Sequence, residues 1–234
     1  MKFIDTTQYV IFMLIISLSS YQVIAEKIDS SNNQSKINKW NFVAYLDDDK
    51  IGYHNFEVIE NNGEVVVNTE AKFDVTFMFI PVYSYEHNNT EIWNNDCLTS
   101  MDSRTLDDGE ELFVQLSSQN GTSKINTHDK SISQADCVRS FAYWDYDLIK
   151  SKALLNSQTG ELIDVSYRFV GSDVINVNNK PLQARHYQLL GKDGAGNLID
   201  ISLWYNSNNH WLALHSRLDN GYSLRYQLEK GVEQ

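Results

Sequence analysis

The sequence predicts an all-β, mainly antiparallel fold, in which a long curved meander forms a barrel or half-barrel with at most one or two short helices. One observation is the alternation of apolar and polar residues from Val65 to Tyr85. A period of two places one face of a strand on a core and the other in water. The other observation is a series of shorter alternating segments in the last third of the chain, separated by turn sequences, which is typical of antiparallel barrels and sandwiches.

The first strands are expected over residues 40–46 and 51–59, with an acidic turn between them. A tight hairpin at Asn61-Asn62-Gly63 then leads into a single strand over 65–85, far longer than the usual ~5–6 residues. A strand of that length twists and bends with its sheet. The region that follows, 87–134, is less regular, and one strand is expected there at 112–116.

A short helical turn is expected within residues 141–155. From Glu161 onward the meander resumes, with strands expected over 162–169, 182–190, 198–205, 211–218 and 222–228. No linker-like segment divides the two halves, and the length suits one β domain. We therefore predict a single β domain over residues 39–230.

The N-terminus has the pattern of a secretory signal peptide over residues 1–25. Lys2 precedes an apolar run at 9–17, and Val23 and Ala25 are the small residues expected for cleavage between Ala25 and Glu26. The run is shorter than the ~20 residues that span a bilayer. The pattern predicts a periplasmic or secreted protein without a transmembrane segment in the mature chain, and a retained anchor is the alternative. Residues 26–38 are polar and predict a disordered leader.

The charge balance excludes some partners. The formal net charge is −12 at pH 7, and no basic stripe offers a surface for nucleic acid or anionic lipid. The glycine-rich stretch at 191–196 is not followed by a helical pattern, so it does not resemble a phosphate-binding loop. We expect no cofactor and no metal site. The sequence does not determine the oligomeric state.

Cys97 and Cys137 are the only cysteines of the chain. In an exported protein such a pair predicts one disulfide bond. A free reactive thiol is the alternative interpretation.

One cluster of polar residues follows the long alternating run. His87 lies beside Glu86, with Glu91 and Asp96 further along, and a histidine with a carboxylate can act as a general acid and base. These four residues are the candidates for a small envelope hydrolase or isomerase. The alternative is that His87 only braces the adjoining loop, because no metal-binding or nucleophile motif accompanies it.

Aromatic side chains on the inward parity of the expected strands suggest a ligand cavity. A wide or half-open barrel leaves such a cavity, whereas a small closed barrel fills its interior with side chains. The leading hypothesis is therefore a non-enzymatic domain that binds a hydrophobic or amphipathic ligand, such as a lipid or envelope precursor. A protein-interaction module is a further alternative. The candidate ligand-binding residues are Phe73, Phe77, Phe79, Tyr83, Tyr85, Trp93 and His54.

An ordered set of motifs resembles an uncharacterised family of exported proteobacterial proteins, classed as a domain of unknown function. The resemblance covers the mature chain and implies export to the bacterial envelope, a β-rich domain and paired cysteines. It implies no reaction, substrate or catalytic residue. The motifs are W-x-F at 40–42, I-G-x-H-x-F at 51–56, Y-x-Y-E-H at 83–87, E-x-W at 91–93, C-L at 97–98, S-F-A-Y-W at 140–144 and L-L-N-x-Q-T-G at 154–160.

Overall fold

Antiparallel strands make up almost all of the regular structure. The computed structural model describes residues 35–135, 137–218 and 220–229. Within these residues the strands form one 14-stranded sheet, accompanied by one short 3-10 helix, η1 (Tyr146–Lys150). The all-β, mainly antiparallel prediction is confirmed. The predicted signal peptide and most of the predicted leader lie outside the described residues, and residues 36–38 of that leader already belong to the first strand.

The first half of the described chain is a meander in which each strand pairs with the next. Most of its turns place Asn, Asp or Gly at positive φ, where these residues are tolerated best. The strands are β1 (Lys36–Leu46), β2 (Asp49–Asn61), β3 (Glu64–Phe77), β4 (Ile80–Asn94), β5 (Cys97–Asp107), β6 (Glu110–Gln119), β7 (Thr122–Asn126) and β8 (Ser131–Ala135).

The second half is another meander, joined to the first through its last strand. Phe42 of β1 pairs with Leu228 of β14, so the sheet order runs β8 to β1, then β14 to β9. The strands are β9 (Ala153–Leu155), β10 (Leu162–Val177), β11 (Lys180–Lys192), β12 (Leu198–Tyr205), β13 (Trp211–Arg217) and β14 (Ser223–Leu228).

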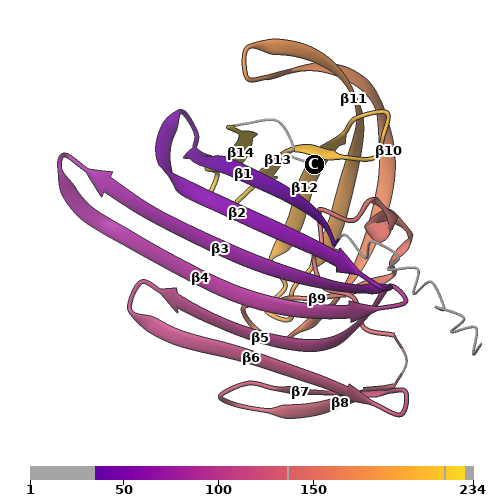
Figure 1. Ribbon diagram of the computed structural model, residues 1–234. Coiled ribbons are helices and arrows are strands. Elements are labelled where there is room, and N and C mark those ends of the chain that lie inside the picture. The colour runs from indigo at the N-terminus through magenta and orange to yellow at the C-terminus, as the bar shows by residue number, and fades with distance from the viewer. Residues whose placement is uncertain (1–34, 136, 219, 230–234) are drawn as a thin grey trace, which may run out of the picture. The chain divides into compact units, whose positions relative to one another are not determined.

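The sheet is curved but not closed, because β8 and β9 are its two edges. Figure 1 shows β3–β6 running along one side and β10–β12 along the other. Residues 138–160, here called the crossing segment, pack between these sides. Trp144 lies 5.8 Å from Trp93 of β4, and Tyr146 lies 5.2 Å from Tyr205 of β12, measured between ring centroids. The crossing segment therefore covers the concave face, where the core sits.

The strand predicted over 65–85 is wrong in one respect, because it is two strands. β3 ends at Phe77 and β4 begins at Ile80, and the chain reverses at Met78 and Phe79 with φ of 48° and 68°. A turn with two positive φ values normally carries Asn, Asp or Gly, and neither Met nor Phe signals it. The predicted inward face of β3 is confirmed, since Val67, Ala71 and Phe73 are buried.

The region 87–134 is more regular than predicted. It holds the second half of β4, all of β5 to β7 and β8 except its last residue, of which only the strand at 112–116 was expected. Serine, threonine and charged residues occupy many of these strand positions, so the apolar alternation is weak. The strands expected elsewhere are present, although β10 continues past the predicted end at Phe169 to Val177.

The predicted disulfide is present between Cys97 at the start of β5 and Cys137, with Cα atoms 5.1 Å apart. The backbone N–H of Leu98 donates to the carbonyl oxygen of Val138 at 2.9 Å. At its far end, the crossing segment contributes β9 to the sheet edge beside β10. The segment is thus fixed at both ends. In the part of the chain that the structure describes, no helix is long and apolar enough to cross a membrane.

Candidate functional site

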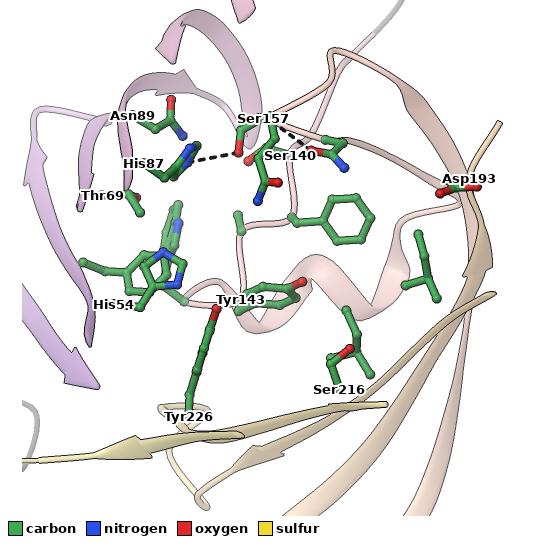
Figure 2. A pocket seen from close by; sticks show the side chains of 18 of the residues that line it. His54, Thr69, His87, Asn89, Ser140, Tyr143, Ser157, Asp193, Ser216 and Tyr226 are labelled. Carbon is green, nitrogen blue, oxygen red and sulfur yellow. Dashed lines mark hydrogen bonds between the residues drawn. The ribbon is translucent and has the colours of Figure 1, made fainter. Parts of the chain in front are cut away.

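A cavity of about 440 Å³ lies between the concave face of β2–β4, the crossing segment and the strands β12–β14. Figure 2 shows labelled side chains from all three parts converging on it. It has two chemically different walls. The polar wall is formed by His54, Thr69, His87, Asn89 and Glu91. The apolar wall is formed by Phe141, Leu198, Ile199, Ile201 and Leu218, and the same stretches of chain, 193–201 and 216–218, also contribute Asp193, Asn197, Ser216 and Arg217 to the lining.

Three residues of the polar wall, His87, Asn89 and Glu91, come from the inward face of β4. Positions 85, 87, 89, 91 and 93 all face inward and are buried, as a period of two requires. Three consecutive members of this row are polar, and His87 and Glu91 are only 3% and 4% exposed. Charged and polar groups are seldom buried unless other groups satisfy them. The hydrogen-bond partners of His87, Asn89 and Glu91 therefore determine what the polar wall can bind.

Glu91 is held by donors from three directions. Asn89 Nδ2 donates to its Oε1 at 2.9 Å, Trp93 Nε1 donates to its Oε2 at 2.8 Å, and the Ser140 side chain also hydrogen-bonds it. Burial raises the pKa of the Glu91 carboxyl, although these hydrogen bonds oppose that shift. The carboxyl group links β4 to the crossing segment and is largely occupied by protein donors.

His87 connects two elements through its ring. Its Nδ1 lies 2.8 Å from the Thr105 hydroxyl of β5, and its Nε2 lies 3.5 Å from the Ser157 hydroxyl of the crossing segment (Figure 2). Burial lowers the pKa of His87 to about 4, because an apolar environment disfavours the charged imidazolium. The ring is therefore neutral near pH 7.

His54 faces the same cavity from β2. Its ring lies 4.3 Å from that of Phe56 and 5.2 Å from that of Tyr226. A Cβ at Gly52 would lie 1.9 Å from the Lys72 carbonyl oxygen, so glycine allows β2 to approach β3 closely just before His54. Burial, followed by the proximity of His87, lowers the pKa of His54 well below its usual value.

Several hydrogen-bonding atoms of the polar wall lack a hydrogen-bond partner. Among the described residues, neither ring nitrogen of His54 has a hydrogen-bond partner, and the Oδ1 of Asn89 has none either. Buried polar atoms are nearly always paired in proteins. These three atoms are enclosed by neighbouring protein atoms and do not face the open part of the cavity, so they stay unpaired inside the wall.

The residues predicted for catalysis do not converge. Glu86 points away from the cavity and pairs with Lys72 at 2.5 Å, and Asp96 is exposed in the turn between β4 and β5. Glu91 shares the cavity with His87, but Asn89 lies between them on the strand, and within the described chain no hydrogen bond joins the His87 ring to a carboxylate. A catalytic role for these residues remains a prediction.

Of the residues predicted to bind a ligand, only His54 lines this cavity. Phe73, Tyr85 and Trp93 are buried in the core, Tyr83 is half-buried, and Phe79 is exposed at the β3–β4 turn. The side chain of Phe77 lies outside what the structure describes. Alternation correctly placed the core residues on the inner face, but it could not show which part of that face the crossing segment fills.

Other cavity residues were missed because they come from distant parts of the sequence. Those in the motifs at 140–144 and 154–160, which carried the family resemblance but no chemical role, are Ser140, Tyr143, Asn156, Ser157 and Gln158. Asn89 on β4 and Tyr226 on β14 also line the cavity and were not predicted. The described residues contain no group of three or more His, Cys, Asp or Glu side chains that could hold a metal ion.

Comparisons with known proteins agree with the fold. No curated protein matches the chain. A crystal structure of a beta-barrel-like protein of domain of unknown function DUF1849, from Brucella abortus, is similar with a TM-score of 0.64 and 10% sequence identity, over 84% of this chain and 97% of that chain. That likeness concerns the fold alone.

The family is shown by a sequence model. The model described as Domain of unknown function (DUF6134) matches residues 42–229, which is most of the chain and nearly all of its strands. The resemblance to an uncharacterised family is thus confirmed at this level, while export and the individual motifs remain predictions. The protein belongs to the DUF6134 family of domains of unknown function.

Proposed function

We propose that this protein is exported and that its inner cavity holds one small amphipathic molecule. The observation that carries the proposal is one cavity of about 440 Å³ whose lining combines polar side chains of β2–β4 with apolar side chains on the facing wall. Small-molecule sites commonly fall within ~300–1,000 Å³ and combine apolar surface with a few polar groups. The cavity lies within that range.

Binding fits the geometry better than catalysis does. A general base needs a proton acceptor within reach of substrate and an orienting partner. His87 instead contacts two hydroxyl groups, and the Glu91 oxygens accept hydrogen bonds from protein donors. The disulfide Cys97–Cys137 supports export, since such bonds persist in oxidising compartments.

The experiment is native mass spectrometry of the protein recovered from its own organism. The proposal predicts a stoichiometric bound molecule on the wild-type protein. Thr69→Phe places a ring in the cavity from β3 and should abolish that adduct. Thr76→Phe makes the same change at an exposed position of the same strand and should keep it. A folded wild-type protein with no adduct, and with no affinity for added amphiphiles, would refute the proposal.

A further inference from the structure

The β3–β4 hairpin extends past the strands on either side of it. Phe73 is the last residue of β3 that pairs with β2, and Tyr85 is the first residue of β4 that pairs with β5. Beyond them, in the described chain, sheet pairing joins residues 75–83 only to one another. We call residues 75–83 the hairpin tip, which Figure 1 shows at the left end of β3 and β4.

The outer part of the hairpin tip is apolar on both faces. It consists of five exposed residues, Met78, Phe79, Ile80, Pro81 and Val82. Successive residues of a strand point to opposite faces, so the exposed apolar surface surrounds the start of β4. No charged residue occurs between positions 75 and 85. Contiguous exposed apolar surface of this kind is typical of a contact site for a protein or a membrane.

The turn does not need apolar residues in order to fold. The other long hairpin, β10–β11, turns at Asn178 and Asn179 with φ of 52° and 60°, close to the 48° and 68° of Met78 and Phe79. Asparagine tolerates these angles, whereas Met and Phe adopt them at a conformational cost. The apolar pair is therefore unfavourable in both backbone conformation and exposure to water. Such strained positions cluster at functional sites.

A lipid bilayer is the partner that fits these features. A bilayer surrounds an inserted hairpin, whereas a protein groove covers one face of it. Backbone groups must be paired inside hydrocarbon, and Val75 pairs with Tyr83 and Phe77 with Ile80 across the tip. Pro81 has no N–H that could be left unpaired. Tyr83 is half-buried at the base of the tip, and tyrosine is enriched where a protein meets lipid headgroups.

The charge beside the tip favours a surface without net negative charge. The two flanking turns, β1–β2 and β5–β6, carry six exposed acidic residues, Asp47, Asp48, Asp49, Asp108, Glu110 and Glu111. Lys50 is also exposed there, and Arg225 pairs with Asp48, so the negative charge is only partly offset. Like charges repel, which disfavours an anionic membrane and equally disfavours a second copy of this tip.

The acidic turns lie behind the apolar end of the tip. The backbone N–H of Asp108 donates to the carbonyl oxygen of Ser84 at 2.8 Å, so the β5–β6 turn reaches no further than Ser84. At ~3.3 Å per strand residue, Phe79 extends roughly 16 Å beyond that point. The apolar end can therefore enter a bilayer while the carboxylates of the β5–β6 turn stay in water.

We propose that the hairpin tip inserts into the surface of a zwitterionic lipid bilayer and holds the domain there. Insertion is shallow and reversible, because a single tip buries few side chains. No residue of the tip lines the inner cavity, and the tip meets lipid as an assembled surface. The inference is thus independent of the cavity and of its ligand.

The test is flotation of the protein with phosphatidylcholine vesicles, with which wild type should float. Phe79→Ser should bind at least about tenfold more weakly, since burial of a Phe side chain contributes at least that factor. Phe169→Ser is the matched control, because Phe169 is also an exposed ring but lies on β10, and it should bind like wild type.

Vesicles with added phosphatidylglycerol test the effect of charge. At low ionic strength, wild type should bind these anionic vesicles more weakly than pure phosphatidylcholine vesicles. The difference should shrink at physiological salt, where the Debye length is about 8 Å.

A fluorescent variant reports insertion directly. The emission added by Phe79→Trp should be quenched by brominated acyl chains, whereas that added by Phe169→Trp should not. This pair decides the question even if Phe79→Ser fails to fold.

Three results would overturn the proposal. One is that wild type does not float with phosphatidylcholine vesicles, and another is that Phe79→Ser floats equally well. The third is self-association without lipid that Phe79→Ser abolishes, in a protein that does not bind vesicles, because the tip would then contact a second copy. Thr69→Phe, which fills the cavity, should float like wild type, so the membrane proposal and the cavity proposal fail separately.

Discussion

The two ends of the β3–β4 hairpin differ in which side chains they bury: apolar side chains are exposed at the turn, and polar side chains are buried further along β4. At the turn, Met78 and Phe79 are 77% and 102% exposed. Further along β4, His87, Asn89 and Glu91 are buried on the concave face. The same hairpin thus presents apolar side chains to solvent and encloses polar ones.

The difference shows that alternation selects a face of the sheet but does not decide burial. Burial on the concave face depends on the crossing segment, which supplies Ser140 to Glu91 and Ser157 to His87. The turn at Met78 and Phe79 has no such cover among the described residues. The crossing segment therefore supplies hydrogen-bond partners that help to keep His87 and Glu91 buried.

The largest effect is expected from removing the carboxyl group of Glu91. Glu91→Ala leaves three buried donors without an acceptor, at ~1–3 kcal/mol each, so we expect a loss of about 5 kcal/mol in the free energy of unfolding. Glu91→Gln keeps one acceptor oxygen and should lose about 2 kcal/mol. Urea denaturation followed by tryptophan fluorescence measures both. Equal stability of Glu91→Ala and wild type would show that Glu91 does not hold the crossing segment.

The disulfide should stabilise the same end of the crossing segment, because Cys137 lies just before Ser140 in the chain. Cys97 and Cys137 are 40 residues apart in sequence, and closing a loop of that length stabilises the fold by roughly 4 kcal/mol on the chain-entropy model. Cys97→Ser should therefore lower the melting temperature under oxidising conditions and leave the order of ligand affinities unchanged. The same melting temperature for the variant and the oxidised wild type would contradict the expectation.

Acid should destabilise the polar wall through His87. Its pKa is about 4 in the folded protein, compared with ~6.5 unfolded, so the unfolded state binds more protons between these values. The contribution is fully present above pH 6.5 and is lost as the pH falls towards 4, by roughly 2–3 kcal/mol. His54 acts in the same direction, whereas Glu91, with its raised pKa, acts in the opposite direction.

Because His54 and Glu91 also contribute to the pH dependence of stability, the contribution of His87 is measured by comparing a variant with wild type. His87→Gln should show a smaller loss of stability between pH 6.5 and pH 4.5 than wild type in urea titrations. Parallel profiles for the two proteins would mean that His87 is not buried as a neutral ring.

The smallest effect is expected at the turn. Met78 and Phe79 adopt positive φ, which is unfavourable for such residues, whereas Asn-Gly suits this turn. Replacing the pair by Met78→Asn and Phe79→Gly should raise stability by about 1 kcal/mol. It should leave the binding of an amphiphile in the cavity unchanged, since neither residue lines that cavity. Loss of amphiphile binding in this double variant would place the binding surface at the turn instead.

The sequence predicted the class of fold because alternation and turn residues are local signals. It predicted the disulfide because only two cysteines exist. It failed at Met78-Phe79, where apolar residues occupy a turn, and in β5, β7 and β8, where polar residues obscure the period of two.

The site was less predictable for a physical reason. Whether His54, Phe73 or Tyr85 meets a ligand or the core depends on where residues 138–160 pack. That contact joins positions far apart in sequence, such as Ser157 and His87. No local pattern encodes it, and three of the aromatic candidates, Phe73, Tyr85 and Trp93, are core residues.

The most direct test follows the imidazole resonances of His54 and His215 by nuclear magnetic resonance during titration with a short-chain amphiphile, 1-O-octylglycerol. A ligand in the inner cavity should shift the His54 signals in a saturable way and leave those of His215 in place, because only His54 lines the cavity. It should also leave the Met78 methyl signal unchanged. Saturable shifts at Met78, with His54 unaffected, would contradict the assignment of binding to the inner cavity.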